Sequence, residues 1–222
     1  MKRMLVLVLV ATMAASAFAQ TQDKEPSAPI SEDLVALQTA NSLARYGYST
    51  DSASALIGAA EIFAQIRTQP LGIEPTRSQS SGSATVSTPE FTPANLLRDA
   101  RRLARNNNTL LAWATEVERT LNTQTRGAAG GPRFAREVIV SGANHNYTFT
   151  FRAGERADIT LVGNGVSDLD LYIYDENGNL IRYDEGYSDV ASLWFIPAWT
   201  GRFTVRVKNW GNIANRYELY TN

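Results

Sequence analysis

Three acidic side chains that could bind a cation stand close together in one short stretch of the chain. Residues 167–179 read SDLDLYIYDENGN and contain Asp168, Asp170 and Asp175. Calcium takes several oxygen ligands, and carboxylates on one strand and its turn can supply them together with loop carbonyl oxygens. We therefore consider calcium as the ion that this stretch could hold.

The same three aspartates also have an explanation that needs no metal. Asp168 and Asp170 fall on the polar face of an alternating segment, where carboxylates are common. Asp175 has the position of an ordinary hairpin-turn residue. The spacing of an EF-hand loop is absent from the sequence. Both explanations therefore stay open at this point.

Aromatic side chains in the same part of the chain are candidates for binding a ligand. They are Tyr172, Tyr174, Trp199 and Trp210. Outward-facing tyrosine and tryptophan rings can stack on sugars or grip a polypeptide. The tyrosines could instead fill cross-strand positions, and Trp199 could cap the core. We predict that Tyr172 and Tyr174 face outward.

No group of residues in the sequence has the composition of a catalytic site. The chain has no cysteine, and its one histidine, His145, lies in the polar segment SGANHN. A serine triad would have to use His145, and it would need partners that no motif supplies. We expect His145 to be a surface-loop residue, and we expect no catalytic residue and no enzymatic activity.

The alternation within residues 167–179 indicates the element that positions these side chains. Leu169, Leu171 and Ile173 fall on one face, as in a half-buried β-strand. The strand leads into Asn177-Gly178, a pair suited to a tight hairpin turn.

Similar strand-like segments fill the C-terminal half of the chain. Their spacing is typical of an antiparallel β-sandwich. The predicted strands cover residues 134–140, 146–151, 156–162, 168–174, 180–183, 191–196, 201–208 and 216–220.

Four motifs follow one another in residues 134–222. They are YTFTF (147–151), SDLDLYIYDENGN (167–179), LWFIPAWTGRFTVRVKNW (193–210) and RYELY (216–220). This order resembles the bacterial pre-peptidase C-terminal (PPC) domain family. The resemblance implies a non-catalytic β-sandwich of exported proteins, associated with secretion, adhesion or stabilisation. It also implies calcium as a ligand, because similar collagen-binding modules bind it.

The N-terminal half predicts four amphipathic helices within residues 31–124. The first is expected over residues 32–45 and is expected to end at Gly47. Asp51 or Ser52 should cap the second helix. The pairs are loosely similar to tetratricopeptide hairpins, but a small bundle of two helical hairpins is the simpler prediction. The predicted fold class is therefore α+β, with a helical domain before the β-sandwich.

The third and fourth predicted helices also begin at recognisable caps. Thr92 precedes Pro93, the pair expected at an N-cap and first helical position. One asparagine of residues 106–108 should cap the fourth helix. Residues 68–91, rich in proline, serine and threonine, are predicted to be a flexible loop, and residues 125–133 a linker.

The first nineteen residues have the pattern of a signal peptide. A basic start precedes the apolar run MLVLVLV, and Ala17-Phe18-Ala19 fits a cleavage site. The apolar run is too short to span a bilayer, so we expect a periplasmic or secreted protein without membrane insertion. A formal net charge of -1 gives no reason to expect a nucleic-acid partner.

Two functional hypotheses follow from the sequence. In the first, the protein is an exported, non-catalytic binding or adhesion module whose sandwich contacts a polypeptide or glycan, with calcium as a stabilising ion. In the second, it is a periplasmic scaffolding protein that interacts through its paired helices. The partner in either case is an exported or surface protein or glycan.

Overall fold

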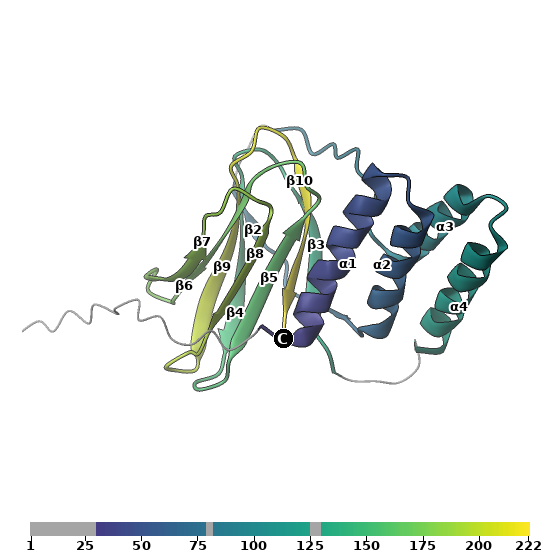
Figure 1. The fold of residues 1–222 in the computed structure, drawn as a ribbon. Coiled ribbons are helices and arrows are strands. Elements are labelled where there is room, and N and C mark those ends of the chain that lie inside the picture. The colour runs from purple at the N-terminus through teal and green to yellow at the C-terminus, as the bar shows by residue number, and fades with distance from the viewer. Residues whose placement is uncertain (1–29, 79–81, 125–129) are drawn as a thin grey trace, which may run out of the picture.

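The computed structural model describes residues 30–78, 82–124 and 130–222. The predicted signal peptide, residues 1–19, and most of the predicted linker lie outside these ranges. Four helices are followed by two sheets packed face to face, which confirms the α+β class (Figure 1). The helices are α1 (Glu32–Ser49), α2 (Ala53–Gln65), α3 (Pro93–Ala104) and α4 (Asn108–Gln124).

Two five-stranded sheets form the β-sandwich. Sheet A has the order β1-β3-β10-β5-β8, and sheet B has the order β2-β4-β9-β6-β7. All pairs are antiparallel except that of β1 with β3. The strands are β1 (Gln69–Pro70), β2 (Thr76–Arg77), β3 (Arg133–Ile139), β4 (Asn144–Phe151), β5 (Ala157–Gly163), β6 (Leu169–Tyr174), β7 (Leu180–Asp184), β8 (Val190–Phe195), β9 (Gly201–Asn209) and β10 (Asn215–Thr221).

Side-chain caps start three of the helices at the predicted places. The Ser52 hydroxyl accepts a hydrogen bond from the backbone N–H of Ala55, at 3.3 Å. The Thr92 hydroxyl caps α3 in the same way. The Asn107 amide oxygen accepts from the N–H of Leu110, at 3.2 Å. Each cap satisfies a backbone donor that has no partner within its helix.

The predicted end of the first helix at Gly47 is wrong. Helix α1 continues through Gly47 to Ser49. A Cβ atom on Gly47 would lie 2.5 Å from the Leu56 side chain. The glycine therefore allows α2 to approach α1 closely, and it does not terminate the helix.

The predicted flexible loop over residues 68–91 is wrong for its first part. Strand β1 extends sheet A beside β3, and β2 extends sheet B beside β4. Leu71, between these two strands, is 2% exposed and packs in the core between the sheets. Two-residue strands are too short to show a period of two, which explains why the sequence pattern missed them.

The core between the sheets follows the predicted alternation, with Leu169, Leu171 and Ile173 fully buried. The core also contains His145, so the prediction of a surface-loop histidine is wrong. His145 is 2% exposed, and its Nδ1 lies 2.8 Å from the Tyr217 hydroxyl. That hydroxyl in turn lies 2.7 Å from the Tyr147 hydroxyl. The three polar groups satisfy one another inside an apolar core.

Helix α1 covers the outer face of sheet A. Leu34 and Leu37 of α1 form one buried cluster with Val162 of β5 and Tyr220 of β10. The other helices lie beyond α1, on the side away from sheet B (Figure 1). Every residue of β5 is buried because one face of the strand meets sheet B and the other meets α1.

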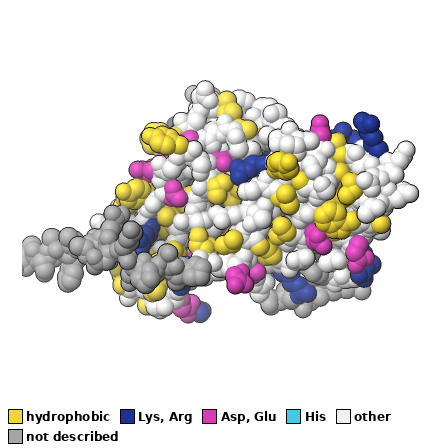
Figure 2. Space-filling view, in the orientation of Figure 1, with side chains coloured by type: hydrophobic (Ala, Val, Ile, Leu, Met, Phe, Trp, Pro, Cys, Tyr) yellow, Lys and Arg dark blue, Asp and Glu magenta, His cyan; other side chains and the backbone are white. Residues whose placement is uncertain are grey.

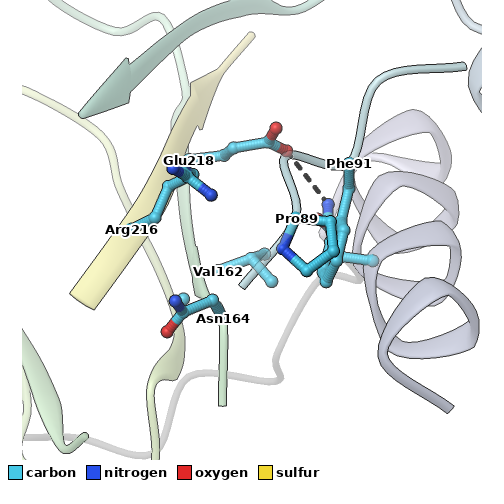
Figure 3. Close-up of a pocket in the computed structure, with 8 residues that line it drawn as sticks. Pro89, Phe91, Val162, Asn164, Arg216 and Glu218 are labelled. Carbon is cyan, nitrogen blue, oxygen red and sulfur yellow. Dashed lines mark hydrogen bonds between the residues drawn. The ribbon is translucent and has the colours of Figure 1, made fainter. Parts of the chain in front are cut away.

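Charged side chains are built into this junction of helix and sheet. Glu218 of β10 is 4% exposed and accepts hydrogen bonds from Arg136, Tyr220 and Asn41. Figure 3 shows Glu218 reaching from β10 toward α1, with the bond from Asn41 as a dashed line. Arg45 of α1 lies 2.9 Å from the Asp189 carboxylate beside sheet A. The two buried carboxylates of the junction, Glu218 and Asp189, therefore each have an arginine partner.

Among the residues described, no helix is both long and apolar enough to cross a membrane.

Candidate functional site

None of the helices in the described part of the chain packs on the outer face of sheet B (Figure 1). We call its outward-facing residues the sheet B face. The strand register places one residue from each of the five strands in a row across this face. From β7 to β2 the row is Tyr183, Tyr172, Arg206, Asn146 and Thr76. This row combines aromatic rings, a cation and neutral hydrogen-bonding groups.

A second row lies beside the first. It places Leu180, Tyr174, Thr204 and Thr148 next to one another on β7, β6, β9 and β4. Leu180 is 49% exposed, and Thr148 is exposed as well. The two tyrosines of β6, Tyr172 and Tyr174, are stacked with ring centroids 6.2 Å apart. The face thus carries a pair of parallel rings beside a polar strip.

Arg206 links the tyrosines to the polar strip. Its guanidinium lies 4.7 Å from the centroid of the Tyr174 ring, a cation–π contact. Its Nε donates to the Asn146 amide oxygen at 2.8 Å, and its Nη1 donates to the Tyr174 hydroxyl at 3.3 Å. These contacts fix the guanidinium in place without neutralising its charge. Arg206 therefore presents a positioned positive charge at the centre of the face.

Tyr172 lies on this face as predicted, but it is only 9% exposed. Its hydroxyl donates to Asp170 at 2.7 Å and also contacts Glu185 at 2.9 Å. The Trp210 side chain lies close enough to both Asp170 and Tyr172 to lower their pKa values in part. Three predicted site residues, Asp170, Tyr172 and Trp210, therefore meet in one cluster. Residues from distant parts of the chain cover Tyr172. It is therefore less accessible than the alternating pattern of its strand indicates.

The electrostatics of this cluster follow from its burial. Burial, with the neighbouring charges of Asp168 and Glu185, raises the pKa of the Asp170 carboxyl above its ordinary value. Burial and the hydrogen bond to Asp170 also raise the pKa of the Tyr172 hydroxyl. Tyr172 therefore remains a neutral hydrogen-bond donor at neutral pH.

The three aspartates predicted as a calcium site do not act together. Asp175 accepts hydrogen bonds from the backbone N–H groups of Asn177 and Asn179 in the β6–β7 hairpin. These bonds and one from the Asn179 side chain outweigh burial and lower the pKa of Asp175. Within the described ranges, no three acidic or histidine side chains gather closely enough to hold a metal ion. The carboxylate of Asp175 is thus occupied by the turn.

Trp199 lies apart from the tyrosine rows. Its ring stacks on Phe203 with centroids 5.6 Å apart, and it is 40% exposed. It borders a pocket of about 530 Å³ at one end of the sandwich, which Asp175 and Leu180 also line. The structure therefore brings Trp199 close to Asp175 and not to Trp210. Trp210 is 62% exposed, with Lys208 Nζ 4.7 Å from its ring centroid.

One cavity at the helix–sheet junction is very small. It measures about 10 Å³, and Figure 3 shows Pro89, Phe91, Val162 and Asn164 among its lining residues. That volume holds about one water molecule. This cavity is therefore too small for a substrate, although wider pockets of about 190 and 430 Å³ also border the junction.

Sequence reasoning missed the polar members of the sheet B face, above all Arg206, Lys208 and Asn146. A signal was present, because residues 201–208 alternate Phe203, Val205 and Val207 with polar residues. The pattern predicts which side chains point outward. It does not predict that β9 lies between β4 and β6, and this order brings the cations beside the tyrosines.

Comparisons with known proteins give weak similarity. No protein-family model matches the sequence, and the curated proteins contain no match. The pre-peptidase C-terminal domain of a collagenase from Bacillus anthracis is 18% identical, with a TM-score of 0.33, over 40% of this chain and 87% of that one. PliG from Aeromonas hydrophila, a periplasmic inhibitor of g-type lysozyme, is 13% identical, with a TM-score of 0.34, over 44% of this chain and 91% of that one.

A carbohydrate-binding module of lichenase 5A from Cellvibrio mixtus, solved with cellotriose, is a further similar structure. It is 11% identical, with a TM-score of 0.27, over 40% of this chain and 86% of that one. We therefore argue the function from the residues of the sheet B face alone.

Proposed function

We propose that this protein is an exported, non-catalytic binding module whose sheet B face contacts a glycan or polypeptide. The observation that carries the proposal is the row from Tyr183 to Thr76, which crosses five strands. Stacked rings and fixed polar groups on a rigid sheet are the means by which proteins hold extended polymers without reacting with them. Export rests on the signal-peptide pattern of residues 1–19.

A direct test is binding of the full chain to immobilised polysaccharides and to gelatin as a polypeptide probe. We expect Tyr174→Ala to weaken binding by about tenfold or more, since alanine removes a central ring. Tyr46→Ala is the matched control, because Tyr46 is an exposed tyrosine of α1, 57% accessible and far from the sheet B face. It should bind as the unchanged protein does.

The alternative is a scaffolding protein that interacts through its helices. Exposed apolar side chains on α1, Val35 at 46% and Tyr46 at 57%, are the observation in its favour. If Tyr46→Ala lost binding while Tyr174→Ala retained it, the helices would be the binding region and the proposal for sheet B would fail.

A further inference from the structure

The central strand of the sheet B face carries a column of positive charge. Side chains at alternate positions of β9 point outward, and among them are Arg202, Arg206 and Lys208. Strand geometry places neighbouring outward positions about 6.7 Å apart. Arg206 and Lys208 occupy neighbouring outward positions. Arg202 lies two outward positions from Arg206, which is about 13 Å. The cations therefore form a line along the strand.

A carboxylate lies beside this column, because the strand register places Asp170 directly across from Lys208. No ion pair involves Arg202, Arg206 or Lys208 among the described residues, although ten ion pairs are present elsewhere. Figure 2 shows another aspect of the surface, where basic and acidic side chains are interspersed. A line of positive charge on an open face can attract a negatively charged ligand from outside the chain.

The neighbours of this column suit a sugar polymer. On the β4 side, Asn144, Asn146 and Thr150 pair in register with Lys208, Arg206 and Arg202. On the β6 side, Tyr172 pairs with Arg206, and Asp170 pairs with Lys208. Amide and hydroxyl groups can hydrogen-bond sugar hydroxyls, and tyrosine rings can stack on the apolar faces of sugar rings.

The position of β9 disfavours an acidic peptide. Sheets usually capture peptides by adding a strand at an exposed edge. Strand β9 is an interior strand, hydrogen-bonded to β4 on one side and to β6 on the other. A ligand on the face can contact side chains only. A stiff polymer with regularly spaced charge uses such a surface at less entropic cost than a flexible peptide.

From these observations we infer that the sheet B face binds an anionic polysaccharide along β9, a specificity that rests on the proposed function. Arg202, Arg206 and Lys208 contact the acidic groups, and Tyr174 contacts a sugar ring. Carboxylated and sulfated polymers share the required chemistry.

The test is affinity electrophoresis of the full chain through gels that contain one polymer each. The probes are polygalacturonic acid, dextran sulfate, neutral dextran and poly-L-glutamate. We expect retardation by one or both anionic polysaccharides. Raising the salt from about 0.05 M to 0.5 M should weaken binding, since this shortens the screening length. Retardation by dextran sulfate alone would identify sulfate as the acidic group that is bound. Retardation by polygalacturonic acid alone would identify carboxylate.

The double variant Arg206→Gln with Lys208→Gln should lower affinity for the anionic polysaccharide by about tenfold or more. The control is Arg102→Gln with Arg105→Gln, which removes two exposed arginines at the end of α3. It should leave retardation unchanged. Thermal unfolding of both variants checks that the fold is retained.

Four outcomes would overturn the inference. Equal loss in both double variants would mean that net charge, and not the β9 column, causes the retardation. Stronger retardation by poly-L-glutamate would identify an acidic polypeptide as the ligand. Binding to neutral dextran alone would remove the anionic specificity and leave the proposed function standing, whereas binding to no probe would count against both.

Discussion

The two outer faces of the sandwich are built on the same core but are completed in different ways. The face of sheet A is covered by α1, and its two buried carboxylates have cationic partners: Asp189 pairs with Arg45, and Glu218 pairs with Arg136. Among the described residues, the face of sheet B has no helix packed on it, and its central cation, Arg206, is in no ion pair. A covered face must neutralise its charges within the chain, whereas an open face can leave them for a ligand.

The difference separates charges that stabilise the fold from charges available for binding. Glu218 is 4% exposed, so its partners exist to offset its loss of hydration. Arg206 is partly exposed and is positioned by neutral groups, Asn146 and Tyr174. The presence of a charged side chain therefore does not by itself identify the binding site. A charged side chain that is held in place but not neutralised does identify it.

The largest effect should come from removing the central charge of the junction. Glu218→Ala leaves Arg136, Tyr220 and Asn41 without their shared acceptor, and we expect a loss of about 3 kcal/mol in the free energy of unfolding. Urea denaturation followed by circular dichroism measures it. Glu116→Ala removes an exposed ion-pair partner of Arg119 and should leave the transition in place. Equal effects in both variants would contradict the distinction between the two classes of charge.

A pH titration tests the core that both faces share. Burial, with the nearby charge of Arg77, lowers the pKa of His145 from 6.5 to about 4. Between these pH values the unfolded chain binds a proton that the folded chain does not bind, so stability falls as the pH is lowered. The shift corresponds to about 3 kcal/mol, present in full above pH 6.5 and lost as pH falls to 4.

The measurement is the free energy of unfolding at about pH 7 and pH 4.5, compared between the unchanged protein and His145→Gln. The variant should show a smaller loss at low pH, because the glutamine side chain does not titrate. Identical pH profiles would mean that His145 titrates normally and that the acid sensitivity lies in carboxylates such as those of the junction.

Much of the fold could be predicted from local patterns. Alternation placed Leu169, Leu171 and Ile173 in the core, and cap chemistry located the start of α3 at Thr92. Such signals depend on residues close together in the chain. The path of β1 and β2 could not be predicted, because two-residue strands have no period to detect.

The candidate site could be predicted only in part, for a related reason. The sequence identified Tyr172 and Tyr174 as outward-facing, but the burial of Tyr172 depends on contacts with Glu185 and Trp210 from other parts of the chain. Arg206 was overlooked because its importance comes from the strand order, which places β9 beside β6. Contacts between distant segments decide which polar residues are accessible, and no local pattern records them.

The smallest expected effects on stability come from substituting one arginine on each face. These two substitutions also compare the faces most directly. Arg45→Ala removes the partner of Asp189, whose side chain is 7% exposed, so we expect a loss of about 1–2 kcal/mol in the free energy of unfolding. Arg206→Ala removes a cation that pairs with no carboxylate, and it should cost about 0.5 kcal/mol or less.

Ligand binding should show the opposite order. Arg206→Ala should weaken binding at the sheet B face, and Arg45→Ala should leave it unchanged, since Arg45 lies at the junction on the other side of the sandwich. Urea denaturation and affinity electrophoresis of the same two proteins measure both properties. If Arg206→Ala destabilised the fold as much as Arg45→Ala and left binding intact, Arg206 would have a structural role. The open face would then be completed by its own side chains, as the covered face is by α1, and the contrast between the two faces would no longer hold.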